Sequence, residues 1–165
     1  MTTLRKTFVG LTLALDYPML IITTVDQEER AGCLVGFTTQ CSIDPPRYLV
    51  CLSDKNRTTR VAARASALAV HFVPETARDL AELFGSETDD TIDKFEHCAW
   101  HPGPAGLPLL DRCRRWFAGR ILDRRPLGDH IGHLLEPFAA GDDDDGDGEL
   151  LMFSQSKSIH PGHEP

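Results

Sequence analysis

Short apolar runs rich in β-branched residues, each bounded by a polar turn, restrict the fold of this chain more than any other feature. Seven of them follow one another, at residues 19–25, 31–39, 47–52, 67–73, 114–123, 129–137 and 150–153. Runs of this length between turn residues are typical of β-strands. Helical spacing of apolar residues marks two segments, 58–66 and 75–84. We therefore predict a mostly β barrel of Greek-key type with a few short helices.

Single residues within this pattern predict how the elements begin, end and pack. Thr59 is a candidate cap for the first helix, and Gly85 stands where the second helix should end. Gly32 and Gly36 lie inside one apolar run, which indicates a bulge or a close approach by another backbone or a ligand. Residues 98–110 hold prolines and glycines in quick succession, so we expect an extended, irregular connection there.

The length of 165 residues fits one domain. Hydrophobic residues make up 41% of the chain, which is ordinary for a globular protein with a real core. We predict a single domain over residues 1–165, with an acidic hairpin tip near 142–147 and a flexible polar tail at 156–165.

The charge balance and the cysteines narrow the partners and the compartment. With a net charge of −8, the surface should repel nucleic acid, although a local basic pocket for one small anion remains possible. No apolar run reaches the roughly 18 residues of a membrane span, and we interpret residues 8–15 as the first structured segment rather than a signal peptide. Five cysteines without a C-x-x-C pair favour a reducing cytoplasm.

Residues 32–59 hold the densest set of groups that could bind a ligand. Gly36 would let a flat ring approach the backbone. After it, residues 37–41 offer backbone donors and acceptors, the hydroxyls of Thr38 and Thr39, and the amide of Gln40. The 53–59 loop adds cations and hydroxyls before a helix, a combination that binds phosphate. An ordinary strand, loop and helix with solvated charges would give the same pattern, and the residues alone leave both interpretations open.

Other candidate sites are weaker. His97, Cys98 and His101, with Cys113 beyond, lack the paired spacing of a structural zinc site, so we predict no metal. We expect Cys51 to lie near Cys41 on an adjacent strand, where a redox thiol or a small core side chain would both fit. The strand–helix alternation and the G-x-G-x-x-G motif of a Rossmann sheet are absent from the sequence.

Several motifs in order resemble the flavin reductase-like family, the FMN-binding split barrels. The resemblance covers roughly residues 16 to 155. It rests on Thr23-Thr24-Val25-Asp26, Gly32 to Cys41, Ser42-Ile43-Asp44-Pro45-Pro46, the 53–59 loop, Ala69-Val70-His71-Phe72, Leu80-Ala81-Glu82-Leu83-Phe84, Asp93-Lys94-Phe95, Gly106-Leu107-Pro108-Leu109-Leu110 and Gly128-Asp129-His130. No single motif is decisive, and the order of the set carries the resemblance.

The resemblance implies an FMN-binding split β-barrel and specific roles for its residues. The isoalloxazine and ribityl chain would lie along Leu34, Val35, Gly36, Phe37, Thr38, Thr39, Gln40 and Cys41. The phosphate would be held by Lys55, Asn56, Arg57, Thr58 and Thr59. His130 would lie near the nicotinamide, although a strand-end histidine bonded to a neighbouring loop fits equally well. Residues around 154–156 would contact the same cofactor, and two copies would form a homodimer with flavin sites near the interface.

One stretch departs from the family pattern. Many members carry T-x-S/N where this chain has Leu34-Val35-Gly36, so side-chain hydrogen bonds to the flavin are lost there. We expect backbone contacts to replace them, with Thr38, Thr39 and Gln40 providing the polar groups. The substitution leaves the choice between FMN and FAD open.

The resemblance implies an NAD(P)H-dependent flavin reductase that moves a hydride from NADH or NADPH to FMN or FAD, with a monooxygenase as a possible partner. Gly128-Asp129-His130 favours this enzyme. The altered Leu34-Val35-Gly36 triplet favours an alternative, a split barrel that binds flavin, F420 or haem without nicotinamide-dependent turnover. A third possibility is a flavoenzyme that holds FMN tightly and acts on an organic substrate.

Overall fold

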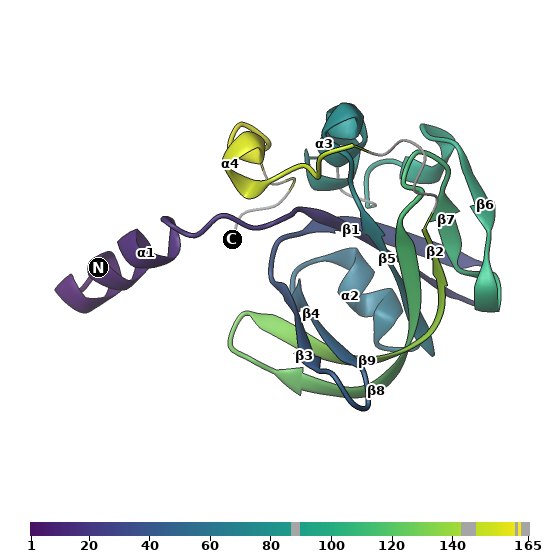
Figure 1. The fold of residues 1–165 in the computed structure, drawn as a ribbon, viewed down its shortest axis with the longest axis horizontal. Helices are drawn as coiled ribbons and strands as arrows, with labels where there is room; N and C mark the ends of the chain where they lie inside the picture. The colour runs from purple at the N-terminus through teal and green to yellow at the C-terminus, as the bar shows by residue number, and fades with distance from the viewer. Residues whose placement is uncertain (87–89, 143–147, 161, 163–165) are drawn as a thin grey trace.

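The computed structural model describes residues 1–165 except 87–89, 143–147, 161 and 163–165. A seven-stranded antiparallel sheet in the order β2-β1-β5-β8-β9-β4-β3 forms its body (Figure 1). The strands are β1 (Leu20–Asp26), β2 (Glu29–Val35), β3 (Thr38–Ser42), β4 (Arg47–Ser53), β5 (Ala67–Phe72), β8 (Trp116–Pro126) and β9 (His130–Gly141). The mostly β prediction is confirmed.

Four helices and a small hairpin complete the fold. Figure 1 shows the sheet curling around one helix and leaving another well clear of the body. The helices are α1 (Thr3–Thr12), α2 (Arg57–Ala62), α3 (Arg78–Ser86) and α4 (Phe153–Ser156), with single 3₁₀ turns at Glu75–Ala77, Lys94–Glu96 and Pro104–Gly106. The hairpin is β6 (Trp100–Pro102) with β7 (Pro108–Leu110).

β1 is buried on both faces because its apolar side chains alternate between two cores. Leu20 and Ile22 join the inner core, where Ala62 of α2 packs against the curved sheet. Ile21 faces the outer core, which contains Phe84 of α3. The sheet therefore lies between α2 on its concave side and α3 on its convex side (Figure 1).

The two glycines of the second apolar run are sites of close approach, but the groups that approach them are aromatic side chains rather than the predicted backbone or ligand. A Cβ at Gly32 would lie 2.7 Å from Cε1 of Phe84, and one at Gly36 would lie 2.7 Å from Cε2 of Tyr17. The predicted single strand at 31–39 is nevertheless wrong, because the chain leaves β2 after Val35 and begins β3 at Thr38.

Three further observations correct the sequence predictions. Asn56, not Thr59, caps α2, because its Oδ1 accepts the N–H of Thr58 at 2.9 Å. Gly85 lies inside α3, which ends one residue later. The irregular connection at 98–110 contains the β6–β7 hairpin.

The predicted last strand at 150–153 is reduced to isolated bridges. Leu150 pairs with Pro74, and Met152 pairs with Pro18. α4 then begins at Phe153. The acidic hairpin tip falls outside the described residues except Asp142, and the tail falls outside them at 161 and 163–165.

Candidate functional site

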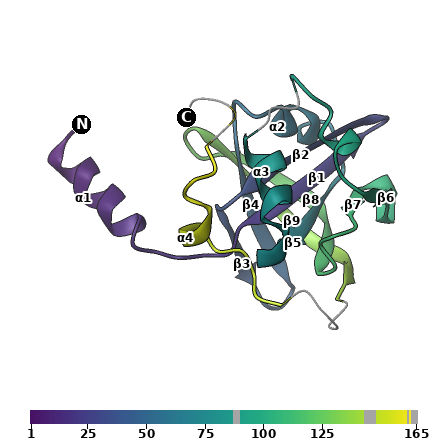
Figure 2. The same ribbon diagram turned by 90° about the horizontal axis from the view of Figure 1, so that it is seen from above.

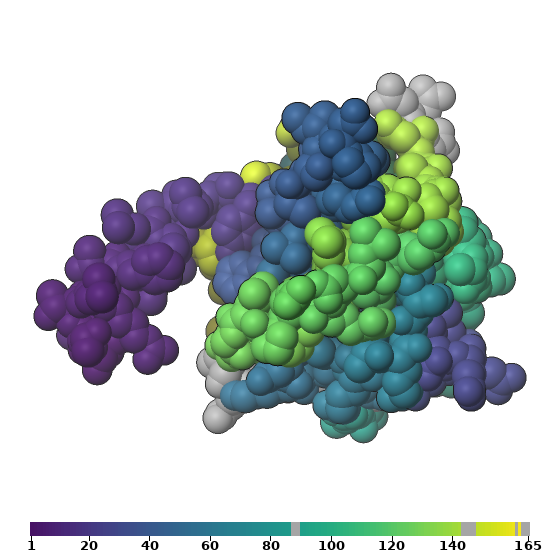
Figure 3. All heavy atoms as spheres, turned by 90° about the horizontal axis from the view of Figure 1, so that it is seen from below, coloured from purple at the N-terminus to yellow at the C-terminus, as the bar shows by residue number. Residues whose placement is uncertain are grey.

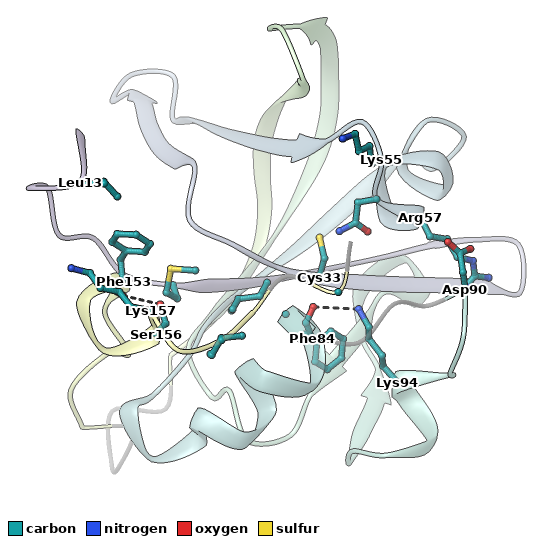
Figure 4. Close-up of a pocket in the computed structure, with 16 residues that line it drawn as sticks. Leu13, Cys33, Lys55, Arg57, Phe84, Asp90, Lys94, Phe153, Ser156 and Lys157 are labelled. Carbon is teal, nitrogen blue, oxygen red and sulfur yellow. Dashed lines mark hydrogen bonds between the residues drawn. The ribbon is translucent and has the colours of Figure 1, made fainter. Parts of the chain in front are cut away.

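Two adjoining pockets, of about 530 and 270 Å³, form one groove along β2. They share five lining residues from separate segments of the chain, namely Met19, Cys33, Leu34, Asn56 and Phe153. Figure 4 shows the larger pocket between the β4–α2 loop on one side and α3 with the C-terminal segment on the other. Volumes in this range suit a small organic ligand or cofactor.

The narrow end of the groove has aromatic walls. The rings of Tyr17 and Phe153 stack with centroids 4.8 Å apart and planes 13° from parallel. Phe37 lies opposite His130, with ring centroids 5.2 Å apart. Gly36 also lines this end, and its missing Cβ lets the Tyr17 ring pack closely against the backbone. This end has the shape and chemistry to hold a flat ring.

Cys51 also lines the narrow end, whereas Cys41 lies on β3 away from the groove. Burial raises the pKa of the Cys51 thiol. The thiol is therefore protonated at neutral pH, which makes it a small apolar wall residue rather than a nucleophile.

The wide end of the groove is cationic. Lys55, Arg57, Lys94 and Lys157 line it, together with the carboxylate of Asp90. The guanidinium of Arg57 is 3.1 Å from a Glu29 carboxylate oxygen, which holds it in place beside the groove. Convergent ammonium and guanidinium groups of this kind bind phosphate.

Lys94 is the most deeply buried of these cations, with 2% of its surface exposed. Its ammonium donates to the carbonyl oxygen of Gly32 at 2.9 Å. It also donates to that of Phe84 at 3.2 Å (Figure 4). The Phe84 carbonyl belongs to the last turn of α3, where a positive charge is favourable. The sequence marked Lys94 only as part of a motif, because burial of a lysine is a property of the tertiary structure.

His130 lies at the first position of β9, beside the narrow end. Its Nδ1 is 2.6 Å from Oδ1 of Asp129. This contact lowers the pKa of the Asp129 carboxyl. The His130 ring lines the groove beside the ring of Phe37.

The segment after residue 150 forms the remaining wall. Asp16 accepts hydrogen bonds from the amide and hydroxyl of Ser154 at 2.9 and 2.7 Å, and these bonds lower the pKa of its carboxyl. Gln155 Nε2 donates to Glu75 at 3.0 Å. These contacts hold Phe153, Ser156, Lys157 and Ile159 against the groove.

The structure brings together seven of the residues predicted for the 34–41 and 53–59 segments. Leu34, Val35, Gly36, Phe37, Lys55, Asn56 and Arg57 line the groove, as does His130. The sequence missed Tyr17, Met19, Lys94 and Lys157 as lining residues. Tyr17 and Met19 directly precede the first strand, and nothing in their local sequence marks them as groove residues.

The β3 residues of the prediction lie elsewhere. The Thr38 hydroxyl is 2.9 Å from the Tyr48 hydroxyl, and Gln40 with Cys41 borders a separate hollow at residues 40–44. Thr39 bonds the carbonyl of Gln40. The turn after Val35 sends these side chains to the edge of the sheet, so none of them lines the groove.

Thr58 and Thr59 are buried behind the groove rather than in its wall. The Thr59 hydroxyl donates to the Ser53 carbonyl at 2.5 Å. Their amides are bonded to Asn56, which uses up the first donors of α2.

The described residues show neither a metal cluster nor a membrane-spanning helix. Among the residues that the structure describes, no three or more His, Cys, Asp or Glu side chains gather as a metal site would require. His101 instead contacts Asp111 at 2.6 Å, and burial raises the pKa of Cys98 to about 11. Across the same described residues, no helix has the length and apolar character to cross a bilayer.

Comparison with known proteins matches residues 13–160 to the flavin reductase like domain. The chain is 34% identical over 138 residues to the FMN reductase (NADH) RutF of Stutzerimonas stutzeri, a match that covers 82% of this chain and 77% of that protein. It is 31% identical over 114 residues to a Rhizobium meliloti protein named "Probable flavin reductase", covering 67% of this chain and 36% of that protein. The chain thus spans about a third of that relative's length.

The fold also resembles solved structures. A homologue of nitrilotriacetate monooxygenase component B from Mycobacterium thermoresistibile superposes with a TM-score of 0.81 at 23% identity. The superposition covers 90% of this chain and 82% of that one. At this identity the similarity concerns the fold alone.

Proposed function

The chain belongs to the flavin reductase-like domain family, and on this premise we propose that it is an NAD(P)H:flavin oxidoreductase. The flavin supplies the hydride chemistry when it is bound, and the protein must hold and align two ring systems. The observation that carries the proposal is the groove itself, which joins an aromatic slot to a cluster of cations.

The residues present fit a phosphorylated flavin. A Cβ at Gly36 would lie 2.7 Å from Cε2 of Tyr17, so the glycine lets this ring pack against the backbone and form one aromatic wall for a flat group. At the other end, Lys55, Arg57 and Lys94 suit the charge of a phosphate. The aromatic slot and the cationic end are joined through Cys33 and Leu34, as a ring, a polar chain and a phosphate would require.

We assign roles to the chain's own residues on this basis. Gly36 and Phe37 border the ring, with the backbone of Leu34 and Val35 beside it. Lys55, Asn56 and Arg57 hold the phosphate. Backbone N–H groups near a ring that gains negative charge would stabilise it electrostatically. The predicted contacts of Thr38, Thr39, Gln40, Cys41, Thr58 and Thr59 would require these side chains to move, and we leave them out of the proposed site.

His130 is the proposed positioning group for the nicotinamide. Its ring faces Phe37 at the narrow end, and its Nδ1 contact with Asp129 fixes the ring's orientation. It would bind and orient the reductant, and no proton transfer by His130 is needed for a hydride step.

We also propose the flavin, the reductant, the oligomeric state and the class of partner. We expect FMN as the flavin, with FAD as an alternative, and NADH or NADPH as reductant. We also expect a homodimer in the cytoplasm, with a flavin-dependent monooxygenase as a possible recipient of reduced flavin. A relative of 28% identity over 127 residues, named the 4-hydroxyphenylacetate 3-monooxygenase reductase component of Pseudomonas aeruginosa, supports that partner class.

The test is anaerobic oxidation of NADH and of NADPH by the purified protein with FMN, FAD or riboflavin added. Saturable oxidation that depends on one flavin and one nicotinamide would name both cofactors. The matched control is His130→Gln, which should raise the KM for the nicotinamide while the flavin Kd stays the same. Flavin binding without oxidation of either nicotinamide would contradict the reductase.

A second function is favoured by one feature, the apolar Leu34-Val35-Gly36 stretch in place of hydrogen-bonding side chains. A split barrel that holds flavin, F420 or haem without nicotinamide turnover would need only the groove. A purified protein that keeps its chromophore through dialysis would favour this function, whereas ready loss of flavin favours the reductase.

A further inference from the structure

One carboxylate lies directly behind the cationic end of the groove. Glu29 is the first residue of β2, and one of its carboxylate oxygens lies 3.1 Å from Nη2 of Arg57. Its other oxygen accepts a hydrogen bond from Nη2 of Arg64 at 2.6 Å. Arg57 lines the groove, whereas Arg64 is not among the lining residues. Glu29 is therefore shared between an arginine that faces the ligand space and one that anchors the carboxylate from behind.

Contacts between the β1–β2 hairpin and α2 hold the Glu29 side chain in place. α2 packs along both strands of this hairpin (Figures 1 and 2). Arg64, which follows the end of α2, donates through Nε to Oδ2 of Asp26 at 2.8 Å as well as to Glu29. Asp26 and Glu29 are register partners across the hairpin. Because one guanidinium binds both carboxylates, Glu29 is fixed next to Arg57.

The same hairpin offers a matched comparison for Glu29. Glu28 precedes it in the turn and is exposed, on the hairpin tip that Figure 3 shows in indigo at the edge of the molecule. Glu28 carries the same charge but forms no ion pair with any residue that the structure describes. The contact with Arg57 thus depends on the position of Glu29 and not on the general acidity of the hairpin tip.

A second carboxylate of the protein balances charge at the same end. Asp90 lines the wide end of the groove, and Arg60 donates to both of its oxygens at 2.9 and 3.0 Å. Figure 4 shows Asp90 at the same end of the pocket as Arg57. A phosphate would therefore meet several cations here together with carboxylates that partly neutralise them. Such a site prefers phosphate without reaching the affinity that unopposed cations would give.

The contact between Glu29 and Arg57 has two opposing consequences for phosphate binding. It restrains a long side chain beside the groove, which favours binding, and it adds a negative charge near the phosphate, which disfavours binding. A guanidinium has five N–H donors, so Arg57 can bind Glu29 and a phosphate at once. Arg57 is the first residue of α2, and the Asn56 cap already orders the backbone there. The restraint from Glu29 therefore adds little, and its charge decides the balance.

We infer that Glu29 is a specificity-determining residue of the phosphate end, whose carboxylate shares Arg57 with the flavin phosphate and lowers the affinity for FMN. The protein thereby binds FMN as a substrate that leaves after reduction and not as a permanent prosthetic group. The inference rests on the proposed function, which supplies the flavin. It deepens that function by naming the residue that limits the affinity for the phosphate.

Flavin titration of Glu29→Gln in the full-length chain tests the inference. The amide oxygen still accepts a hydrogen bond from Arg57 but carries no charge, so FMN should bind roughly threefold to tenfold more tightly. Riboflavin, which has no phosphate, should keep its wild-type Kd. The matched control Glu28→Gln removes the same charge one residue away and should leave the Kd of both flavins unchanged.

Three results of these titrations would overturn the inference. Unchanged or weaker FMN binding by Glu29→Gln would mean that Glu29 only positions Arg57. An equal gain in Glu28→Gln would indicate a general effect of the hairpin charge, and an equal gain for riboflavin would indicate a structural effect. Glu29→Ala is a second variant that removes the contact together with the charge. It should bind FMN at least as tightly as the wild type, and weaker binding would also contradict the inference.

Salt dependence and kinetics provide independent readouts of the charge. The FMN affinity of Glu29→Gln should fall more steeply with rising salt than that of the wild type, because the variant has one carboxylate fewer to oppose its cations. In stopped-flow experiments, FMN should leave Glu29→Gln more slowly, by about the same factor as the change in Kd. A salt dependence and a dissociation rate equal to those of the wild type would contradict the inference.

The binding readouts need no nicotinamide, so the two proposals can fail separately. A wild-type protein that binds FMN but oxidises neither NADH nor NADPH would contradict the proposed function alone. Wild-type FMN affinity in an active Glu29→Gln reductase would contradict the inference alone. Absence of FMN binding in both proteins would overturn both.

Discussion

The two ends of the groove are built in different ways. The cationic end takes Lys55, Asn56 and Arg57 from the junction of β4 and α2, and Lys94 and Lys157 add to this local set. The aromatic end takes Tyr17, Phe37, His130 and Phe153 from four segments that are far apart in the sequence. A phosphate site can thus be encoded locally, whereas a ring slot here depends on how the whole sheet closes. Changes to the scaffold that both ends share should therefore affect stability. Changes to the cationic end should affect phosphate binding, and changes to the aromatic end should affect ring binding.

A fall in pH should have the largest effect on the free energy of unfolding, because it protonates a buried histidine in the core that supports both ends of the groove. His71 is fully buried, its Nε2 accepts the Leu110 amide at 3.2 Å, and Nδ1 therefore donates to the Ile21 carbonyl at 3.0 Å. Burial lowers the pKa of His71 to about 4. The unfolded chain takes up this proton near pH 6.5, so the stability present above that pH is lost as pH falls from 6.5 to 4, by about 3 kcal/mol.

Urea unfolding between pH 7 and pH 4 measures this loss. His71→Gln should flatten the pH dependence across that window, although it will also lower stability at pH 7. A wild-type free energy of unfolding that is constant from pH 6.5 to 4 would rule out the role of His71. Flavins with and without a phosphate should lose binding together, because both ends share this scaffold.

Lys94→Met should have the next largest effect on stability. It should also distinguish the two ends of the groove by their effects on flavin binding. The substitution removes the donor to the carbonyl oxygens of Gly32 and Phe84. Two buried acceptors without a charged donor should cost about 2 kcal/mol of unfolding free energy. The affinity for FMN should fall more than that for riboflavin, because the lost charge faces the phosphate end.

Denaturation and flavin titration of Lys94→Met and Lys157→Met check this prediction. Lys157 lines the same pocket but is exposed, so its removal should leave the unfolding free energy unchanged. If Lys94→Met lost the same factor of affinity for FMN and for riboflavin, the role of Lys94 would be purely structural.

Arg57→Ala should act on the phosphate alone. Loss of one charge-assisted bond should weaken FMN binding about tenfold, on the order of 1 kcal/mol. Riboflavin binding should not change. The control Arg47→Ala removes a cation that pairs with Glu136 outside the groove. Fluorescence titration of both flavins gives the answer, and unchanged FMN affinity would remove Arg57 from the site.

Phe153→Leu should give the smallest effect and the opposite selectivity. The substitution removes the stack between Phe153 and Tyr17, which should contribute about 0.5–1 kcal/mol to the free energy of flavin binding by holding the ring slot in shape. FMN and riboflavin should weaken by the same factor, because the change lies at the ring end. A loss confined to FMN in the same titrations would show that the two ends are not separate.

The strands were largely predictable because their signal is local. Residues 19–25, 47–52 and 67–73 alternate or run apolar over the length of one strand, and β1, β4 and β5 lie within a residue or so of those limits. The errors fall where two local signals compete. Asn56 caps α2 in place of Thr59 because its side chain reaches the Thr58 amide, and both residue types are good caps.

The candidate site was predictable only in part. The 55–57 loop and Gly36 could be found because cations before a helix and a glycine in a strand are local signals. Thr38, Thr39 and Gln40 were expected in the groove, but the turn after Val35 places them on the edge strand. Lys94 and Phe153 could not be found, since their role depends on packing against Phe84 and Tyr17.

The sequence by itself determined a mostly β chain with a few short helices and a cationic loop, because strand length, glycine placement and charge are local properties. Only the tertiary structure decided which side chains meet. The curvature of the sheet brings Tyr17, His130 and Phe153 to one slot and buries Lys94 against two carbonyl groups, while every residue of α1 stays exposed. Such contacts join residues distant in sequence, and their free energy exists only once the chain has folded.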